Sequence, residues 1–322
     1  MAKLYAGVDL GGTSMIAVVA NRRGKVVGSS DCATDRTLGP IRLIESIAAQ
    51  VRLAAKGAGV KVSKIDALGI GAPGAIDRAN GIVTRAPNLG WTDVPLGSEL
   101  SKQLGIDVTL GNDVQVAIIG EHAYGAAKGT KRTVGVWVGT GIGGGLVVRG
   151  KLDRGFRGAA GEIGHMVVDE NGPLCGCGRR GCIEAYASRT AMERDVRALS
   201  QSQAQESAAL RIMREKDKPR MTSSVIEKAL DDGDPIMTNV FTAAQHRLGN
   251  LVGSVVNLFD PEMVVIGGGI AQRLGERFIE PIRNIARSRF LRPDPDCLVH
   301  IEHAVLGDYS GALGACALAA GA

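Results

Sequence analysis

The sequence predicts two related α/β domains that face each other across a cleft. Three observations lead to this fold class. The chain has 322 residues, which is enough for two domains of ordinary size. Its hydrophobic content of 45% is sufficient for large buried cores and excludes general disorder. Finally, an apolar strand, a glycine-rich turn and a second apolar strand occur near the N-terminus and again at residues 133–155.

The first half of the chain is expected to alternate strands with helices. Residues 4–30 contain three short apolar runs, which are separated by turns at 9–13 and 21–24. Apolar residues recur at helical spacing over 41–56, and this pattern predicts an amphipathic helix. The remaining elements expected here are a buried strand at 65–70, the loop GAPG at 71–74, a helix at 95–104, a strand at 108–110 and a helix at 112–124.

The second half repeats the plan of the first, but the spacing agrees only loosely, so the repeat is structural rather than close in sequence. Residues 199–222 are rich in Ser, Gln and charged side chains and are expected to form a mobile surface segment. A long amphipathic helix is predicted over 237–258, where Gly249 and Gly253 allow a neighbour to approach closely. A buried strand at 263–266 and a small, apolar helix at 311–320 complete the half.

Composition narrows the classes of function. The net charge is +5, and no block of like charges is interleaved with aromatic residues, so nucleic-acid binding is not indicated. The most apolar stretch, 251–270, is interrupted by Asp260, Pro261 and Glu262, which excludes a membrane span there. Nothing at the N-terminus resembles a signal peptide, so the six cysteines are expected to be reduced thiols in the cytoplasm.

Glycine is over-represented in this sequence: its 45 residues are about twice the usual share. The glycines gather in three clusters, each at a strand end: Asp9-Leu-Gly-Gly-Thr13, Gly139–Gly145 and Gly267–Gly269. Such loops let backbone N–H groups approach a phosphate, and Asp9 could hold Mg²⁺ beside one. The alternative for the first cluster is an ordinary Gly-Gly hairpin. None of the clusters matches the common P-loop or dinucleotide-binding pattern.

Asn112-Asp113 lies where a predicted strand ends and a helix begins. The functional interpretation makes Asp113 a general base that takes a proton from a substrate hydroxyl. The alternative is simple N-capping, which is what Asn and Asp do most often at this position. The sequence alone favours capping.

The strongest motif is a group of one histidine and three cysteines within 18 residues. These residues are His165, Cys175, Cys177 and Cys182. A Cys₃His set suits tetrahedral Zn²⁺, and glycines at 176, 178 and 181 permit the sharp turns that bring three thiolates together. Because all four positions would be filled by protein, this Zn²⁺ is predicted to be structural. Three buried structural cysteines are the alternative.

Together the motifs resemble the ROK family, which has repressor, open-reading-frame and kinase members. The resemblance rests on DLGGT at 9–13, GTGIGGG at 139–145, GEIGH at 161–165 and CGCGRRGCIE at 175–184, and it covers essentially the whole chain. It implies two actin-like ATPase (ribonuclease H-like) domains flanking a cleft, with a structural zinc loop. The N-terminal domain would comprise residues 1–120 and a returning C-terminal helix at 304–322, and the C-terminal domain residues 121–303.

The resemblance also implies roles for individual residues. Asp113 would be the base. The residues that would bind the sugar are Gly74, Asn88, Asn112, Asp113, Glu162, His165 and Glu184. The residues that would bind ATP and its Mg²⁺ are Asp9, Gly11, Gly12, Thr13, Gly139, Thr140 and Gly141, with Gly267, Gly268 and Gly269 near the adenosine. One departure is Ser14, because the family usually has Lys or Asn after DxGGT.

These features predict a cytoplasmic, ATP-dependent glucokinase that acts as a homodimer or homotetramer, with no nucleic-acid or membrane partner. An N-acetylhexosamine kinase or a fructokinase of the same family is the nearest alternative, and polyphosphate could replace ATP as donor. A sugar-responsive repressor would carry a DNA-binding helix-turn-helix before the DxGGT loop, and only eight residues precede Asp9. A zinc module for nucleic acid needs aromatic residues around the cysteines, and the nearest is Tyr186.

Overall fold

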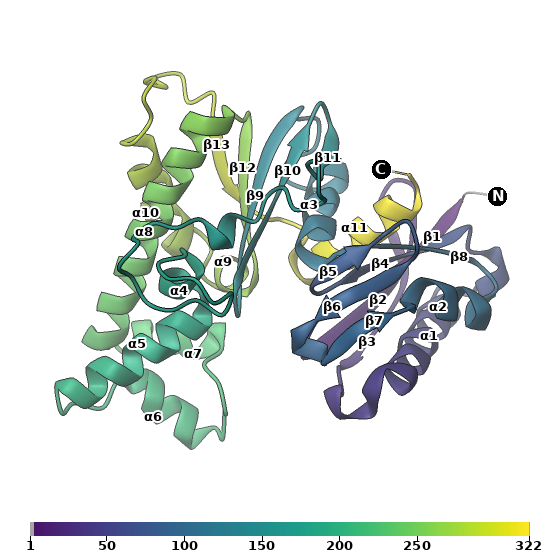
Figure 1. Cartoon of the computed structure of the whole chain (residues 1–322), viewed down its shortest axis with the longest axis horizontal. Coiled ribbons are helices and arrows are strands. Elements are labelled where there is room, and N and C mark those ends of the chain that lie inside the picture. The colour runs from purple at the N-terminus through teal and green to yellow at the C-terminus, as the bar shows by residue number, and fades with distance from the viewer. Residues whose placement is uncertain (1–2, 322) are drawn as a thin grey trace. The chain divides into compact units, whose positions relative to one another are not determined.

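The computed structural model describes residues 3–321, which form two compact units, each with its own sheet and core (Figure 1). The first unit contains the chain up to Thr130, the short segment Gly150–Leu152 and the chain from Val305 onward. The second contains Lys131–Arg149 and Asp153–Ala304. The predicted boundary between residues 120 and 121 is wrong, because it falls inside one continuous helix, α3 (Asp113–Tyr124), which stays in the first unit.

The sheet of the first unit has the strand order β3-β2-β1-β4-β8. The first three strands form an antiparallel meander, and the other two run parallel to the first. Their bounds are β1 (Leu4–Leu10), β2 (Ser14–Asn21), β3 (Val26–Ala33), β4 (Ala67–Ala72) and β8 (Asp107–Asn112). The parallel strands β1, β4 and β8 therefore end at the same edge of the sheet, which is where ligands bind in many α/β folds.

Helices cover both faces of this sheet. On one face α1 (Gly39–Gly57) and α2 (Leu96–Leu104) share a core with alternate residues of β1, and on the other lie α3 and α11 (Ser310–Ala319). A Cβ at Gly7 in β1 would lie 2.0 Å from the carbonyl oxygen of Ala312, and one at Gly69 in β4 would lie 1.9 Å from that of Ala315. The two glycines thus let the backbone of α11 rest directly on the sheet.

A separate three-stranded antiparallel sheet was not predicted. It consists of β5 (Ala75–Asp77), β6 (Ile82–Ala86) and β7 (Trp91–Val94), with the 3₁₀ turn η3 (Pro87–Leu89) between the last two. Its strands are only three to five residues long, which explains why their pattern is weak in the sequence. The sheet matters here because Gly74 directly precedes it and Asn88 lies on its last turn.

The second five-stranded sheet repeats the plan, with the strand order β11-β10-β9-β12-β13, and its strands β9, β10, β12 and β13 belong to the second unit. An antiparallel hairpin again lies beside parallel strands. The bounds are β9 (Arg132–Val138), β10 (Ile142–Val148), β11 (Lys151–Asp153), β12 (Met263–Gly267) and β13 (His300–His303). The first hairpin pairs Leu10 with Met15, while the second pairs Val138 with Ile142, so the second loop is one residue shorter. This difference accounts for the loose agreement in sequence.

The predicted long helix is α8 (Pro235–Phe259), which packs against α10 (Glu276–Arg287) in the core of the second unit. A Cβ at Gly249 would lie 2.6 Å from the Cβ of Ile285, and one at Gly253 would lie 2.6 Å from the Cβ of Arg289. The prediction that these two glycines allow a close neighbour is confirmed. Within residues 3–321, the structure contains no helix that is both long and apolar enough to cross a membrane.

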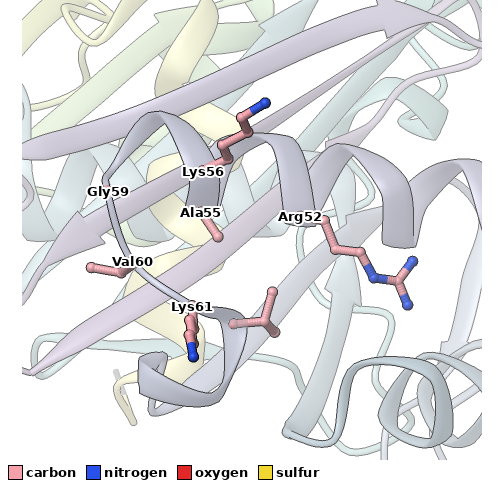
Figure 2. A pocket seen from close by; sticks show the side chains of 7 residues that line it. Arg52, Ala55, Lys56, Gly59, Val60 and Lys61 are labelled. Atoms are coloured by element: carbon pink, nitrogen blue, oxygen red, sulfur yellow. The ribbon is translucent and has the colours of Figure 1, made fainter.

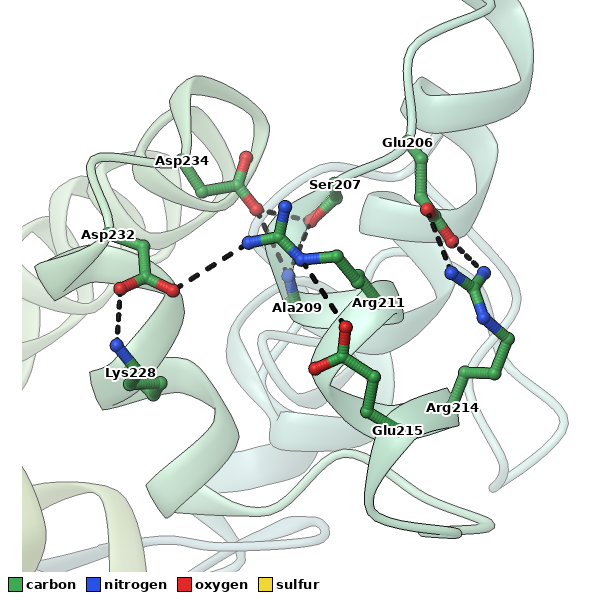
Figure 3. Close-up of polar contacts among 9 residues, drawn as sticks. All are labelled: Glu206, Ser207, Ala209, Arg211, Arg214, Glu215, Lys228, Asp232 and Asp234. Carbon is green, nitrogen blue, oxygen red and sulfur yellow. Dashed lines mark hydrogen bonds and ion pairs between the residues drawn. The ribbon is translucent and has the colours of Figure 1, made fainter.

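Residues 199–222, which were expected to form a mobile surface segment, combine exposed loops with regular helix. This part of the chain finishes α5 (Arg189–Ser202) and then forms α6 (Ala208–Glu215), before α7 (Ser223–Asp231) begins. Figure 3 shows the contacts that hold it: Ser207 donates to the carboxylate of Asp234, which also accepts the N–H of Ala209. Both side chains are buried, and one face of α6 packs into the core. The polar side chains lie mainly in the exposed stretch 201–206, on the exposed face of α6 and in the residues that follow it.

Candidate active site and metal centre

The loop between β1 and β2 carries the predicted phosphate-binding residues of the first unit. Gly11 donates its N–H to the carbonyl of Ser14 at 2.9 Å, which closes the turn. Thr34, which follows β3, makes two hydrogen bonds to this loop. Its backbone N–H donates to the carbonyl oxygen of Thr13 at 3.0 Å, and its hydroxyl donates to the carbonyl oxygen of Gly11 at 2.9 Å. Thr34 was not predicted, because an isolated threonine after a strand carries no sequence signal. A Cβ at Gly12 would lie 3.7 Å from the Cβ of Asn88, so this loop adjoins the small sheet.

Two carboxylates meet at the edge where the parallel strands end. Asp9 pairs with Gly71 of β4, which in turn pairs with Gly111 of β8, so these residues form one row across the sheet. Asp113 follows two residues after Gly111. Burial of the Asp9 carboxyl, together with the negative charge of Asp113, raises the pKa of Asp9 to about 7. The edge therefore disfavours two full negative charges unless a cation joins them.

Asn112 and Asp113 behave differently from each other. The Oδ1 atom of Asn112 accepts the N–H groups of Val114 and Gln115 at 3.1 and 3.2 Å, so Asn112 caps α3 as the simpler interpretation requires. Its Nδ2 atom donates to the carbonyl of Gly74 at 3.2 Å, and this bond ties the small sheet to β8. Asp113 is the first residue of the helix, and its Oδ1 accepts the N–H of Val114 at 2.9 Å.

Gly74 and Asn88 are positioned by the backbone of the small sheet. Gly74 has φ +91°, and a Cβ there would lie 2.1 Å from the carbonyl oxygen of Arg85, so no other residue fits without strain. Asn88 is exposed on the turn before β7, while its neighbours Leu89 and Trp91 are buried and anchor that turn. The first unit thus brings Asp9, Gly12, Gly74, Asn88, Asn112 and Asp113 to adjoining loops.

In the second unit, the loop Gly139–Gly141 is held by two neighbouring elements. Glu184 accepts the N–H of Ile142 at 2.9 Å, and a Cβ at Gly141 would lie 2.4 Å from its Oε2. At the start of α5, the N–H of Arg189 donates to the carbonyl of Gly139 at 2.9 Å, and its guanidinium donates to the hydroxyl of Thr140 at 2.6 Å. Arg189 was not among the predicted residues, because a single arginine outside a recognisable motif gives no signal.

The third glycine cluster lies beside the second. A Cβ at Gly267 would lie 2.5 Å from the ring of Trp137, and Gly268 adopts φ +88° against the carbonyl of Val138. Gly269 begins α9 (Gly269–Leu274), where an added Cβ would lie 3.3 Å from the hydroxyl of Ser223 and 3.9 Å from a guanidinium nitrogen of Arg189. Gly267 and Gly268 therefore serve close packing of the loop against β9.

The predicted metal ligands converge. The ligand atoms of His165, Cys175, Cys177 and Cys182 all lie within 4.8 Å of one another. The Sγ atom of Cys175 lies 3.7 Å from Nδ1 of His165, and the Sγ atoms of Cys177 and Cys182 are also 3.7 Å apart. With Zn–S bonds of about 2.3 Å, tetrahedral ligand atoms lie about 3.8 Å apart, so the four donors fit Zn²⁺.

Local backbone geometry creates this convergence. Cys175 donates its N–H to Arg179 at 2.8 Å and accepts that of Gly178 at 3.0 Å, which forms a tight turn around Cys177. Of the three glycines expected to permit sharp turns, Gly178 and Gly181 have positive φ and Gly176 does not, and a Cβ at Gly181 would lie 1.6 Å from the carbonyl of Asp169. The backbone N–H of Arg179 is the main cause that lowers the pKa of Cys177 to about 6, which favours the thiolate that binds metal.

The predicted sugar-binding residues of the second unit lie around these ligands. Nδ1 of His165 faces the sulfur of Cys175, which leaves Nε2 for another partner. The Oε1 atom of Glu184 lies 3.4 Å from the same sulfur, so Glu184 links the cysteine loop to the glycine loop at 139–141. Glu162 is exposed and directly precedes the 3₁₀ turn η4 (Ile163–His165), which packs on β10 through Gly164.

A cavity of about 510 Å³ at the end of α1 contains none of the predicted residues. Figure 2 shows its three cationic side chains, Arg52, Lys56 and Lys61, pointing in different directions. They do not converge on a common point, so this cavity offers no defined anion site.

A model of the ROK family matches residues 5–322. The chain belongs to the ROK family. This ROK chain is 37% identical to a glucokinase from Thermotoga maritima over 86% of its own length and 85% of the relative's. It is 32% identical to a glucokinase from Streptomyces coelicolor over 98% of its length and 97% of that protein's.

The crystal structure of a ROK family glucokinase from Streptomyces griseus in complex with glucose and AMPPNP superposes with a TM-score of 0.85. The sequences are 31% identical, and the match covers 99% of this ROK chain and all of the other. The predicted actin-like α/β fold and the predicted family are both confirmed.

Proposed function

We propose that the protein is an ATP-dependent glucokinase, which transfers the γ-phosphoryl group of ATP to the 6-hydroxyl of glucose. The observation that carries this proposal is the likeness, over 99% of the chain, to a glucokinase whose crystal complex contains glucose and AMPPNP. The relatives from Thermotoga maritima and Streptomyces coelicolor, both named glucokinase, support the same substrate.

Asp113 is the proposed general base. Its Oδ1 accepts the N–H of Val114, which orients the carboxylate at the N-terminus of α3, where the helix dipole favours the ionised form. As the 6-hydroxyl oxygen attacks the γ-phosphorus, its proton passes to Asp113 and the bond from that phosphorus to ADP breaks. The protein forms no covalent bond, so positioning and charge stabilisation supply the catalysis.

The donor is proposed to lie against the glycine loops. Following the family resemblance, Gly11, Gly12, Thr13, Gly139, Thr140 and Gly141 would present N–H and hydroxyl groups to phosphates, with Gly267–Gly269 beside the adenosine. Asp9 fits a role toward Mg²⁺, because its buried carboxyl has a raised pKa that a cation would lower again. Mg²⁺, when bound, neutralises charge on the phosphate oxygens.

Zn²⁺ is proposed as a structural ion held by His165, Cys175, Cys177 and Cys182, whose donor atoms all lie within 4.8 Å of one another. Its contribution would be to keep the cysteine loop folded. His165 would then use Nε2, and Glu162 its carboxylate, to bind sugar hydroxyls. Asn88 and Asn112 are proposed as further sugar-binding residues on the family resemblance. Glu184 would hold both the sugar and the loop at 139–141, since it already accepts the N–H of Ile142.

The direct test is initial rates with glucose, mannose, fructose, N-acetylglucosamine and N-acetylmannosamine, each with ATP and with polyphosphate as donor. We expect the highest kcat/KM with glucose and ATP, because a site that pairs sugar hydroxyls is left with unpaired polar groups when one is missing or inverted. A preference for an N-acetylhexosamine or fructose would instead support the related kinases. Sugar binding without phosphoryl transfer would support a sugar-sensing repressor.

The family resemblance further leads us to propose a homodimer or homotetramer in the cytoplasm. None of the six cysteines, all of which lie in the described residues, is paired in a disulfide. Light scattering coupled to size-exclusion chromatography tests the assembly.

A further inference from the structure

Arg189 reaches from one glycine loop of the second unit to the other. It is the first residue of α5, and its backbone N–H is fixed on the carbonyl of Gly139 at 2.9 Å. One guanidinium nitrogen donates to the hydroxyl of Thr140 at 2.6 Å. Another lies 3.9 Å from the point that a Cβ on Gly269 would occupy. The side chain is therefore held at the meeting point of the loops 139–141 and 267–269.

The charge of Arg189 is poorly compensated by the protein. Across residues 3–321, no carboxylate forms an ion pair with its guanidinium. The negative charge of Glu193 acts on Arg189. The carboxylate of Glu193, however, forms an ion pair with Arg197 at 2.8 Å and accepts the N–H of Met221 at 2.8 Å. Arg220 adds a second positive charge, and burial lowers the pKa of Arg189.

The partial burial of the Arg189 guanidinium costs free energy unless an anion binds to it. A half-buried guanidinium that makes one hydrogen bond to a neutral hydroxyl keeps four further N–H donors in a planar fork. Such a fork matches the oxygens of a phosphate group, and removal from water makes the attraction stronger. An added Cβ would lie 4.0 Å from its nearest neighbour at Gly139 and 3.3 Å from it at Gly269, so the backbone at these two positions, one in each loop, leaves room for a ligand.

We propose that Arg189 binds a non-transferred phosphate of the nucleotide, between the loops at 139–141 and 267–269. The inference rests on the proposed function, because it assumes that the ligand at these loops is an adenine nucleotide. Arg189 thus sets the affinity for the phosphoryl donor and for the product ADP, and it contributes nothing to sugar binding.

The test uses the full-length variants Arg189→Met and Arg189→Lys, with calorimetry of adenosine, AMP and ADP. Methionine keeps the helical backbone and removes the charge, so we expect the Kd for ADP to rise about 10- to 100-fold, the range for losing a charge-assisted hydrogen bond. The Kd for adenosine is expected to stay within about twofold, because it carries no phosphate. Lysine should restore part of the affinity for ADP.

The matched control is Arg273→Met on α9, which removes the same charge from an exposed side chain that is paired with Glu227. We expect it to change ADP binding by less than about twofold. In steady state, Arg189→Met should raise the KM for ATP and leave the KM for glucose unchanged. The affinity of the wild type for ADP should also fall more steeply with salt than that of the variant.

Two outcomes would overturn the proposal in distinguishable ways. If the wild type phosphorylates glucose and Arg189→Met binds ADP normally, the role of Arg189 is wrong and the proposed function stands. If adenosine and ADP lose affinity equally, Arg189 only shapes the loops, and phosphate binding by it is refuted. A wild type that binds none of the three ligands would refute the proposed ATP dependence together with the inference.

Discussion

Replacement of Gly311 by alanine should damage catalysis through Asp9. Gly311 is the second residue of α11, and an added Cβ would lie 2.2 Å from Oδ2 and 2.4 Å from Cγ of Asp9. The helix has little room to shift, because it rests on β1 at Gly7 on one side and packs closely against α3 on the other, where an added Cβ at Gly314 would lie 1.8 Å from the carbonyl oxygen of Val116. The Asp9 carboxyl must therefore move.

The size of the effect follows from this distance. An ordinary contact needs at least 3.4 Å, so the carboxyl would be displaced by about 1.2 Å. A misplacement of about 1 Å in a positioned group lowers the rate about 100-fold, and we expect a loss of this order in kcat with ATP and Mg²⁺. Overpacking should also cost about 1–3 kcal/mol of stability, which a folded protein of this size can tolerate.

The assay compares kcat, glucose affinity and melting temperature for Gly311→Ala and a control, Gly57→Ala. Gly57 ends α1, and a Cβ there would lie 3.8 Å from its nearest neighbours, so this control should stay within about twofold of wild type. Glucose affinity should change far less than kcat in Gly311→Ala. A folded Gly311→Ala protein with near-normal kcat would show that Asp9 has no positional role.

Three further outcomes are expected. Asp113→Asn should lower kcat about 10²- to 10⁴-fold with little change in glucose affinity, and near-normal turnover would mean that the residue only begins a helix. Cys177→Ser should abolish the single expected Zn²⁺ per chain, measured by metal analysis, and weaken glucose binding strongly while ADP binding survives. Cys297→Ser, at an exposed cysteine outside the cluster, is its control. Because the pKa of Asp9 is about 7 when folded but near 3.8 when unfolded, its neutral form favours the folded state, and the unfolding free energy should fall as pH rises from about 4 to 7. Asp9→Asn should flatten that fall in thermal melts without nucleotide or Mg²⁺, and an unchanged pH dependence would contradict the assignment.

Much of the site could be predicted because its residues are consecutive in the chain. Cys175, Cys177 and Cys182 meet through tight turns that their own intervening glycines create, so the metal centre is almost local. Gly11 and Gly12 lie between two paired strands, and such a hairpin is visible in the pattern of apolar residues. Asn112 ends a strand and begins a helix, and its capping role follows from that position alone.

The sequence by itself determined the repeated α/β plan, the glycine turns and the cysteine cluster, because each depends on backbone preferences of neighbouring residues. Only the tertiary structure decided the rest. The small sheet that carries Asn88 has strands too short to show a period, and it is held by the long-range bond from Asn112 to Gly74. Arg189 and Gly311 acquire their roles from groups 49 and 302 positions away, Thr140 and Asp9. Packing between distant segments depends on the positions of whole elements, and no local pattern of residues encodes those positions.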